Sequence, residues 1–130
     1  VGRPTARLRE LHELTRAAGD AMIAAIRPGV PAVAPHLAAA GVIAAAGLAH
    51  GRVHTSGYSL AAGFVPGWAE PLHLFGGSGF VLRAGMVLTV EPPVYLPAER
   101  LGARLIDNVL VTPGGCERLT LFPRDLIVVE

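Results

Sequence analysis

The last third of the chain constrains the fold more than any other part, because strand-like apolar runs flank a compact turn there. Apolar residues dominate 86–91 and 105–112, the turn Pro113-Gly114-Gly115 follows, and shorter apolar runs occupy 117–120 and 126–129. Runs of this length, bounded by Gly and Pro, predict antiparallel strands joined by a hairpin. We therefore expect strands in these four ranges.

One carboxylate, Glu91, stands at the end of the first of these runs. A buried carboxylate is costly unless a metal, an arginine or a hydrogen-bond donor compensates its charge. Arg104 and Asp107 lie on the second run. They are expected to pair with each other, or Arg104 is expected to neutralise Glu91. Glu91 is therefore the first candidate for chemistry.

The first part of the chain has helical periodicity. Apolar residues recur every three or four positions over 5–26, which predicts an amphipathic helix that Thr5 caps. A second, alanine-rich helix is expected over 32–46, with Pro35 in its first turn and Gly47 as its C-cap. Residues 50–79 are expected to form a long functional loop. Two helices, a loop and antiparallel strands predict the α+β class.

Composition limits the organisation and the partners. The 130 residues suffice for one domain, 1–130. Hydrophobic residues make up 52% and charged residues 16%, where about 25% charged is usual, so we expect apolar surface to be covered by a second copy or another segment. A single cysteine, Cys116, fits a reducing cytoplasm. With a net charge of +1 and no long apolar span, neither nucleic acid nor a membrane is expected as a partner.

Several segments resemble one family. AGMVLTVEPPVY, HTSGYSL, FVPGWAE and DNVLVTPGGCERLTLFPRDL resemble the C-terminal half of the pita-bread metallopeptidase superfamily, which contains Xaa-Pro peptidases, methionine aminopeptidases and creatinase. The resemblance covers nearly the whole chain. It implies two helices on a curved antiparallel sheet, with the first half of the full fold absent. The segments around Tyr58 and Trp68 are similar to an Xaa-Pro peptidase-like or ectoine-hydrolase-like branch.

The resemblance also implies a set of metal ligands. Active members hold two divalent metals, such as Mn, Co or Zn, with two Asp, one His and two Glu. Glu91 matches the first Glu, Tyr58 falls at the His and Ile106 at the second Glu, while a substrate-side His would fall near Val65. Both Asp positions lie before Val1. One ligand of five is present, so we expect no metal cofactor from this chain alone.

The candidate site residues follow from the same comparison. Acid–base or other catalytic roles are assigned to His54, Glu91 and Asp107. Contacts to substrate are assigned to the side chains at four further positions: Tyr58, Trp68, Glu70 and Arg104. Structural roles remain open for several of them. His54 would then support a glycine turn, Tyr58 would pack in the loop, and Trp68 would anchor the core.

Three functional hypotheses remain. The first is a degenerate or truncated Xaa-Pro peptidase-like domain without two-metal catalysis. The second is a hydrolase, either metal-independent and creatinase-like or ectoine-hydrolase-like, or completed by an upstream segment or second chain. Its substrate would be a proline dipeptide or a small cyclic or amidino compound. The third is a non-catalytic module for ligand binding or dimerisation. The expected partner is a second copy or the missing N-terminal half.

Overall fold

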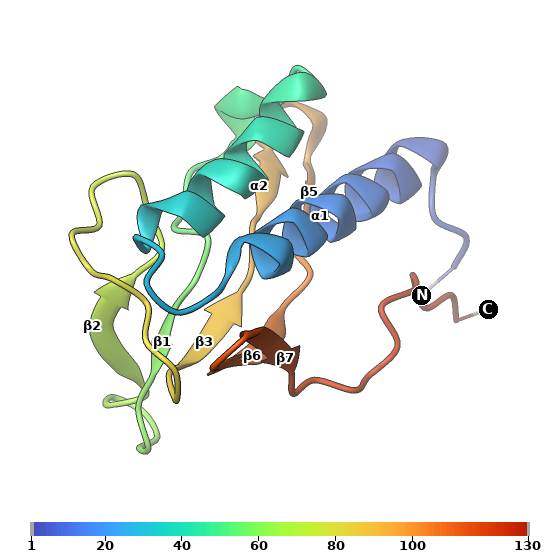
Figure 1. Ribbon diagram of the computed structural model, residues 1–130. Coiled ribbons are helices and arrows are strands. Elements are labelled where there is room, and N and C mark those ends of the chain that lie inside the picture. The colour runs from blue at the N-terminus through green and yellow to red at the C-terminus, as the bar shows by residue number, and fades with distance from the viewer. Residues whose placement is uncertain (1, 130) are drawn as a thin grey trace.

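Two helices pack against an antiparallel sheet in the computed structural model, which describes residues 2–129 (Figure 1). Helices α1 (Ala6–Ala25) and α2 (Val33–Ala45) lie side by side over the sheet. The sheet order is β2-β1-β3-β6-β7. The strand bounds are Tyr58–Leu60 for β1, Ala69–His73 for β2, Val87–Val90 for β3, Asp107–Thr112 for β6 and Gly115–Arg118 for β7. The predicted α+β class is confirmed.

Smaller elements complete the fold. Strands β4 (Val94–Leu96) and β5 (Leu101–Ala103) form a separate two-stranded ribbon, with the 3-10 turn Pro97–Glu99 between them. A second 3-10 turn, Ala49–Gly51, follows α2. Over residues 2–129, no helix combines the length and apolarity needed to cross a membrane.

The start of α1 and the end of α2 have the caps that the sequence predicts. Thr5 Oγ1 accepts a hydrogen bond of 3.1 Å from the Leu8 amide and caps α1. At the end of α2, the Gly47 amide donates to the Ala44 carbonyl at 2.9 Å, and the Leu48 amide donates to the Ile43 carbonyl at 3.2 Å. This pair of bonds is a Schellman motif, and Gly47 supplies the positive φ of 75° that it requires.

The core lies between the helices and one face of the sheet. In the β3–β6 pairing Leu88 lies opposite Val109, and both are fully buried together with Leu11 and Met22 of α1. Burying each such side chain contributes roughly 1.5–3 kcal/mol. Because side chains alternate along a strand, Thr89 and the following Glu91 point to the opposite face. This second face carries the candidate site.

The structure corrects three sequence-based expectations. Residues 50–79 do not form one loop, since β1 and β2 form a hairpin within them, with an irregular register between Tyr58 and Leu60. The predicted strand 126–129 is absent, because Arg124 holds the preceding chain to α1 through Asp20. The predicted strand 117–120 begins two residues earlier and ends at Arg118. The turn over 113–114 and strand β6 match the predicted hairpin.

Candidate functional site

A cavity of about 390 Å³ opens on the sheet face turned away from the helices. Strands β1 and β2, the end of β3 and the segment before β6 contribute its walls. The residues that line it are His54, Thr55, Tyr58, Trp68, Ala69, His73, Glu91, Arg104 and Ile106. Five of the seven candidate residues named from the sequence are among them, so the fold gathers positions that lie up to 50 residues apart in the chain.

Gly57 brings the segment before β1 against β3. A Cβ atom at this position would lie 2.1 Å from the Thr89 carbonyl oxygen, closer than any side chain allows. The close approach lets the Tyr58 amide donate to Thr89 Oγ1 at 3.0 Å and the Glu91 amide donate to the Ser56 carbonyl at 2.8 Å. Glycine is therefore required here for the strands to meet.

The Glu91 carboxylate is held by two side chains of this chain. The residue is only 3% exposed, and its Oε1 accepts a hydrogen bond of 3.0 Å from Thr89 Oγ1. Its Oε2 lies 3.4 Å from Arg104 Nη1, as an ion pair rather than a well-aligned hydrogen bond. Of the two pairings considered for Arg104, the structure shows the one with Glu91. The compensation that a buried carboxylate requires therefore comes from an arginine and a hydroxyl group.

Arg104 keeps donors available to a ligand. Its side chain is 35% exposed, and Glu91 is its one charged partner within residues 2–129. A guanidinium group has five N–H donors in a planar fork that fits a carboxylate. The pocket can therefore bind an anionic group without giving up the contact to Glu91.

Two imidazoles lie in the same cavity. His54 Nδ1 is 2.9 Å from the Thr55 carbonyl oxygen, which can only accept, so Nδ1 carries a hydrogen and, in the neutral form of the ring, Nε2 is the acceptor. His73 lies opposite Tyr58 in the β1–β2 pairing, with ring centroids 5.9 Å apart. Tyr58 is half-buried and borders the cavity, so its ring is accessible to a ligand. The arrangement can accept a proton beside the Glu91–Arg104 pair.

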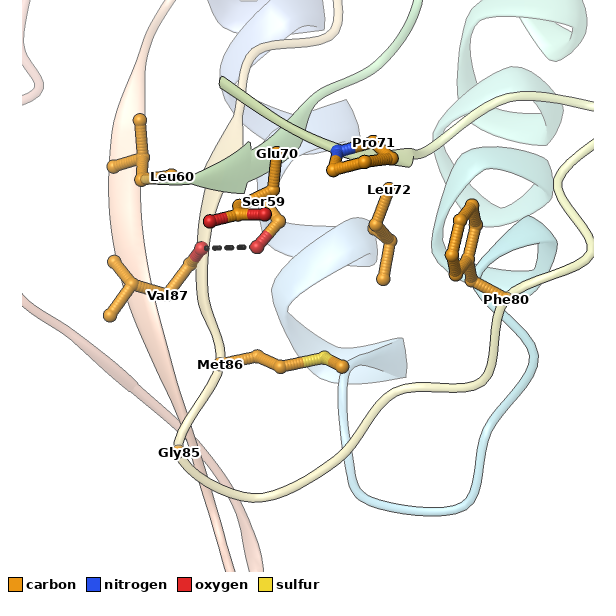
Figure 2. Close-up of a pocket in the computed structure, with 9 residues that line it drawn as sticks. All are labelled: Ser59, Leu60, Glu70, Pro71, Leu72, Phe80, Gly85, Met86 and Val87. Carbon is orange, nitrogen blue, oxygen red and sulfur yellow. Dashed lines mark hydrogen bonds between the residues drawn. The ribbon is translucent and has the colours of Figure 1, made fainter. Parts of the chain in front are cut away.

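Trp68 and Glu70 lie in different places although one residue separates them. Trp68 is 41% exposed at the edge of the cavity, which rules out the alternative role of core anchor. Glu70 lies in a second cavity, shown in Figure 2, together with Ser59 and Met86. Trp68 precedes β2, whereas within β2 the alternation of side chains places Ala69 on the first cavity and Glu70 on the second. The shared pocket wall expected from these two residues is therefore not formed.

Asp107 also lies outside the cavity. It shares the buried face of β6 with Val109 and Val111, is 2% exposed, and has Arg124 Nε at 3.0 Å from Oδ2 and Arg118 Nη1 at 3.9 Å from Oδ1. Neither contact has hydrogen-bond alignment, so both are ion pairs. Through Arg124, Asp107 anchors the segment that follows β7. Its placement outside the cavity gives no support to the catalytic role expected from the sequence.

A polar cluster behind the pocket has no clear signal in the sequence. Arg52 Nη2 donates to Ser56 Oγ at 2.6 Å, and His36 Nδ1 lies 3.0 Å from the same oxygen. Burial and the neighbouring Arg52 charge lower the pKa of His36. Because the Ser56 carbonyl binds the Glu91 amide, this cluster supports the backbone that positions the carboxylate. Its members come from α2 and from the approach to β1, whose contact only the fold reveals.

The donor set does not fit a two-metal centre. Glu91 is the one carboxylate of the cavity, and the neighbouring Ile106 side chain has no lone pair to offer. Within residues 2–129, no group of three or more His, Cys, Asp or Glu side chains is placed to hold a metal ion.

Comparisons with known proteins agree on one family. The model of metallopeptidase family M24 matches residues 1–113. A probable dipeptidase PepE of Mycobacterium tuberculosis is 36% identical over 129 residues, which are 99% of this chain and 33% of the relative. Agropine synthesis cyclase of Rhizobium rhizogenes is 39% identical over 117 residues, 90% of this chain and 28% of the relative. A prolidase structure from Pyrococcus horikoshii superposes with a TM-score of 0.89 at 31% identity, covering 98% of this chain and 35% of that one. The chain thus spans about a third of these relatives.

Proposed function

The chain belongs to metallopeptidase family M24 as an Xaa-Pro dipeptidase-like domain with the C-terminal half of the pita-bread fold, and we propose that its pocket binds a small organic carboxylate without the family's two-metal chemistry. The observation that carries this proposal is the ion pair between Glu91 and Arg104. The guanidinium group compensates the buried Glu91 charge and keeps donors for a ligand carboxylate.

The replaced ligand positions support the same proposal. Tyr58 stands where the family resemblance implies a histidine ligand, and a neutral phenol is a poor substitute for imidazole. Ile106 stands at the second glutamate position and borders the same cavity as Glu91. If a preceding segment supplied both Asp ligands, three of the five ligands would be present. The missing two are internal to this chain, so no additional segment restores them in place.

Arg104 and Trp68 define the ligand that we expect. The exposed edge of the Arg104 guanidinium fits a carboxylate, and the Trp68 ring offers an apolar face at the rim. An Xaa-Pro dipeptide has both a free carboxylate and an apolar ring. The relatives named as dipeptidases support this class of ligand. The remainder of the domain, or a second copy, would close the open side of the cavity.

A second candidate is acid–base chemistry on such a ligand without a metal. His54 favours it, because Nδ1 faces the Thr55 carbonyl, which leaves Nε2 as the acceptor of the neutral ring, and the ring lines the same cavity as Glu91. The relative named agropine synthesis cyclase also supports it, since its name describes a reaction other than peptide hydrolysis. Loss of turnover of a bound ligand in His54→Gln, with binding retained, is the expected outcome for this candidate.

The primary test is binding of Ala-Pro and of its C-terminal amide, measured by the shift in melting temperature. Ala-Pro should stabilise the protein, the amide should not, and Arg104→Gln should abolish the shift. Arg83→Gln is the matched control, because Arg83 is an exposed arginine outside the cavity. Cleavage of Ala-Pro that requires added Mn²⁺ would contradict the proposal, and so would equal stabilisation by the amide.

A further inference from the structure

A second cavity of about 400 Å³ lies beside the β1–β2 hairpin and shares no lining residue with the candidate site. Figure 2 shows Met86 extending toward Leu72, with Phe80 on the far side of the same space. Ser59 and Glu70 add two polar groups from neighbouring strands. The cavity therefore combines an apolar body with a polar end, which is the usual composition of a small-molecule site.

The polar end accepts hydrogen bonds but has little to donate. The Ser59 hydroxyl donates its hydrogen to the Val87 carbonyl at 3.4 Å, so it offers lone pairs to a ligand. The Glu70 side chain is exposed and has no ion-pair or hydrogen-bond partner in the described part of the chain. An ionised carboxylate is an acceptor only, so a ligand must bring donors and positive charge to this end.

The backbone around the cavity leads to the same conclusion. The Gly85 amide donates to the Val111 carbonyl at 2.8 Å, and the Met86 amide donates to the Arg83 carbonyl at 3.3 Å. Pro71 has no N–H group. These three lining positions therefore leave no amide for an anion, and the carboxylate of Glu70 repels one.

The apolar part sets the size of the ligand. Met86 and Phe80 are adaptable and partly exposed, and Leu72 closes the inner wall with 3% exposure. A volume of about 400 Å³ accommodates a single ring or a short alkyl chain with its head group. From charge complementarity and shape, we propose that this cavity binds a small amine or guanidine, in which one cationic group is attached to an apolar body.

Phenethylamine is the probe, because it is a cation with one ring, and phenylacetate is its anionic counterpart. Titration into the ¹⁵N-labelled chain should give saturable shifts at the amides of Ser59, Gly85 and Val87. Phenylacetate should give none at the same concentrations. Glu70→Gln should weaken phenethylamine binding roughly threefold to tenfold, as expected for one solvent-exposed charge-assisted contact.

Two further variants complete the test. Phe80→Ala should also weaken phenethylamine, and since Phe80 is 46% exposed this change should leave the fold intact. Glu117→Gln is the matched control, because it removes an exposed carboxylate outside the cavity and should leave the affinity unchanged. Absence of saturable shifts up to about 10 mM, equal binding of phenylacetate, or shifts centred on Tyr58 and His73 would each overturn the proposal. The first two of these results do not bear on Ala-Pro binding at the other cavity.

Discussion

Replacing Arg104 by Met should destabilise the protein more than replacing Glu91 by Gln, although both changes break the same ion pair. The reason is the difference in burial, since the Glu91 side chain is 4% exposed and that of Arg104 is 35% exposed. Without Arg104, the Glu91 charge keeps only the hydroxyl hydrogen bond from Thr89. Without the Glu91 charge, Arg104 can be hydrated, and the amide oxygen of Gln can still accept from Thr89.

The loss in free energy of unfolding caused by Arg104→Met should lie between two known limits. Exposed ion pairs contribute about 0–1 kcal/mol, and removing one partner of a fully buried pair costs about 3–5 kcal/mol. The 3.4 Å contact and the partial exposure of Arg104 place Arg104→Met at about 1–2 kcal/mol and Glu91→Gln at about 0–1 kcal/mol. In a domain of this size, Arg104→Met should lower the melting temperature by about 3–8 °C.

A double-mutant cycle read by urea denaturation measures the pair directly. The double variant should show a coupling of about 1 kcal/mol between the two positions. Arg83→Met controls for loss of an arginine elsewhere on the surface. The reasoning is refuted if Glu91→Gln costs more than Arg104→Met, or if the coupling is below about 0.3 kcal/mol.

Three further predictions concern parts of the molecule outside the pocket. Arg124→Met removes the closest cation of Asp107 and should cost about 2–4 kcal/mol in urea denaturation, and a cost under about 0.5 kcal/mol would exclude the anchoring role. Burial and Arg52 hold the pKa of His36 below its usual 6.5. The folded state therefore binds fewer protons than the unfolded state, and stability should fall as the pH drops below about 6.5. The melting temperature of His36→Asn should change less than that of the parent between about pH 7.5 and 5.5, and an equal change in both proteins would contradict this. Gly47→Ala should cost about 1 kcal/mol of stability because Gly47 has a positive φ. Gly41→Ala should instead stabilise the protein by up to about 1 kcal/mol, because Gly41 lies in α2 with open space at the position of a Cβ atom. Thermal unfolding that ranks the two variants the other way would contradict the assigned backbone geometry.

Local sequence patterns predict the caps and turns, because these structures depend on contacts between residues adjacent in the chain. The cap at Thr5, the Schellman end at Gly47 and the turn after Thr112 each depend on a few adjacent positions, and the structure has all three. The β1–β2 hairpin is not predicted by such signals, because its Gly and Pro residues also fit a loop. Strand β1 pairs with β3 through Ser59 and Leu88, and β2 pairs with β1, and local sequence does not encode the long-range pairing with β3.

The site is predictable where the family resemblance and the strand period agree. Glu91, Tyr58 and Arg104 meet in one cavity, as their matched positions imply. Asp107 and Glu70 do not, because each lies one residue away from a pocket-lining neighbour and so points to the other face of its strand. The two-residue alternation of a strand, applied to β6, is enough to separate Asp107 from Ile106. The contact of His36 with Ser56 has no such rule, since it joins α2 to the segment before β1.

The central claim of the proposed function is that the side chains at Tyr58 and Ile106, inside this chain, keep the pocket from binding divalent metal. The most direct measurement is a Co²⁺ titration, followed by calorimetry and by the visible absorption of bound cobalt, of the parent chain and of the Tyr58→His/Ile106→Glu variant. The parent should show no saturable binding up to about 1 mM, and the variant, with a restored imidazole and carboxylate beside Glu91, should bind more tightly. Stoichiometric binding by the parent that disappears in Glu91→Gln would contradict the account.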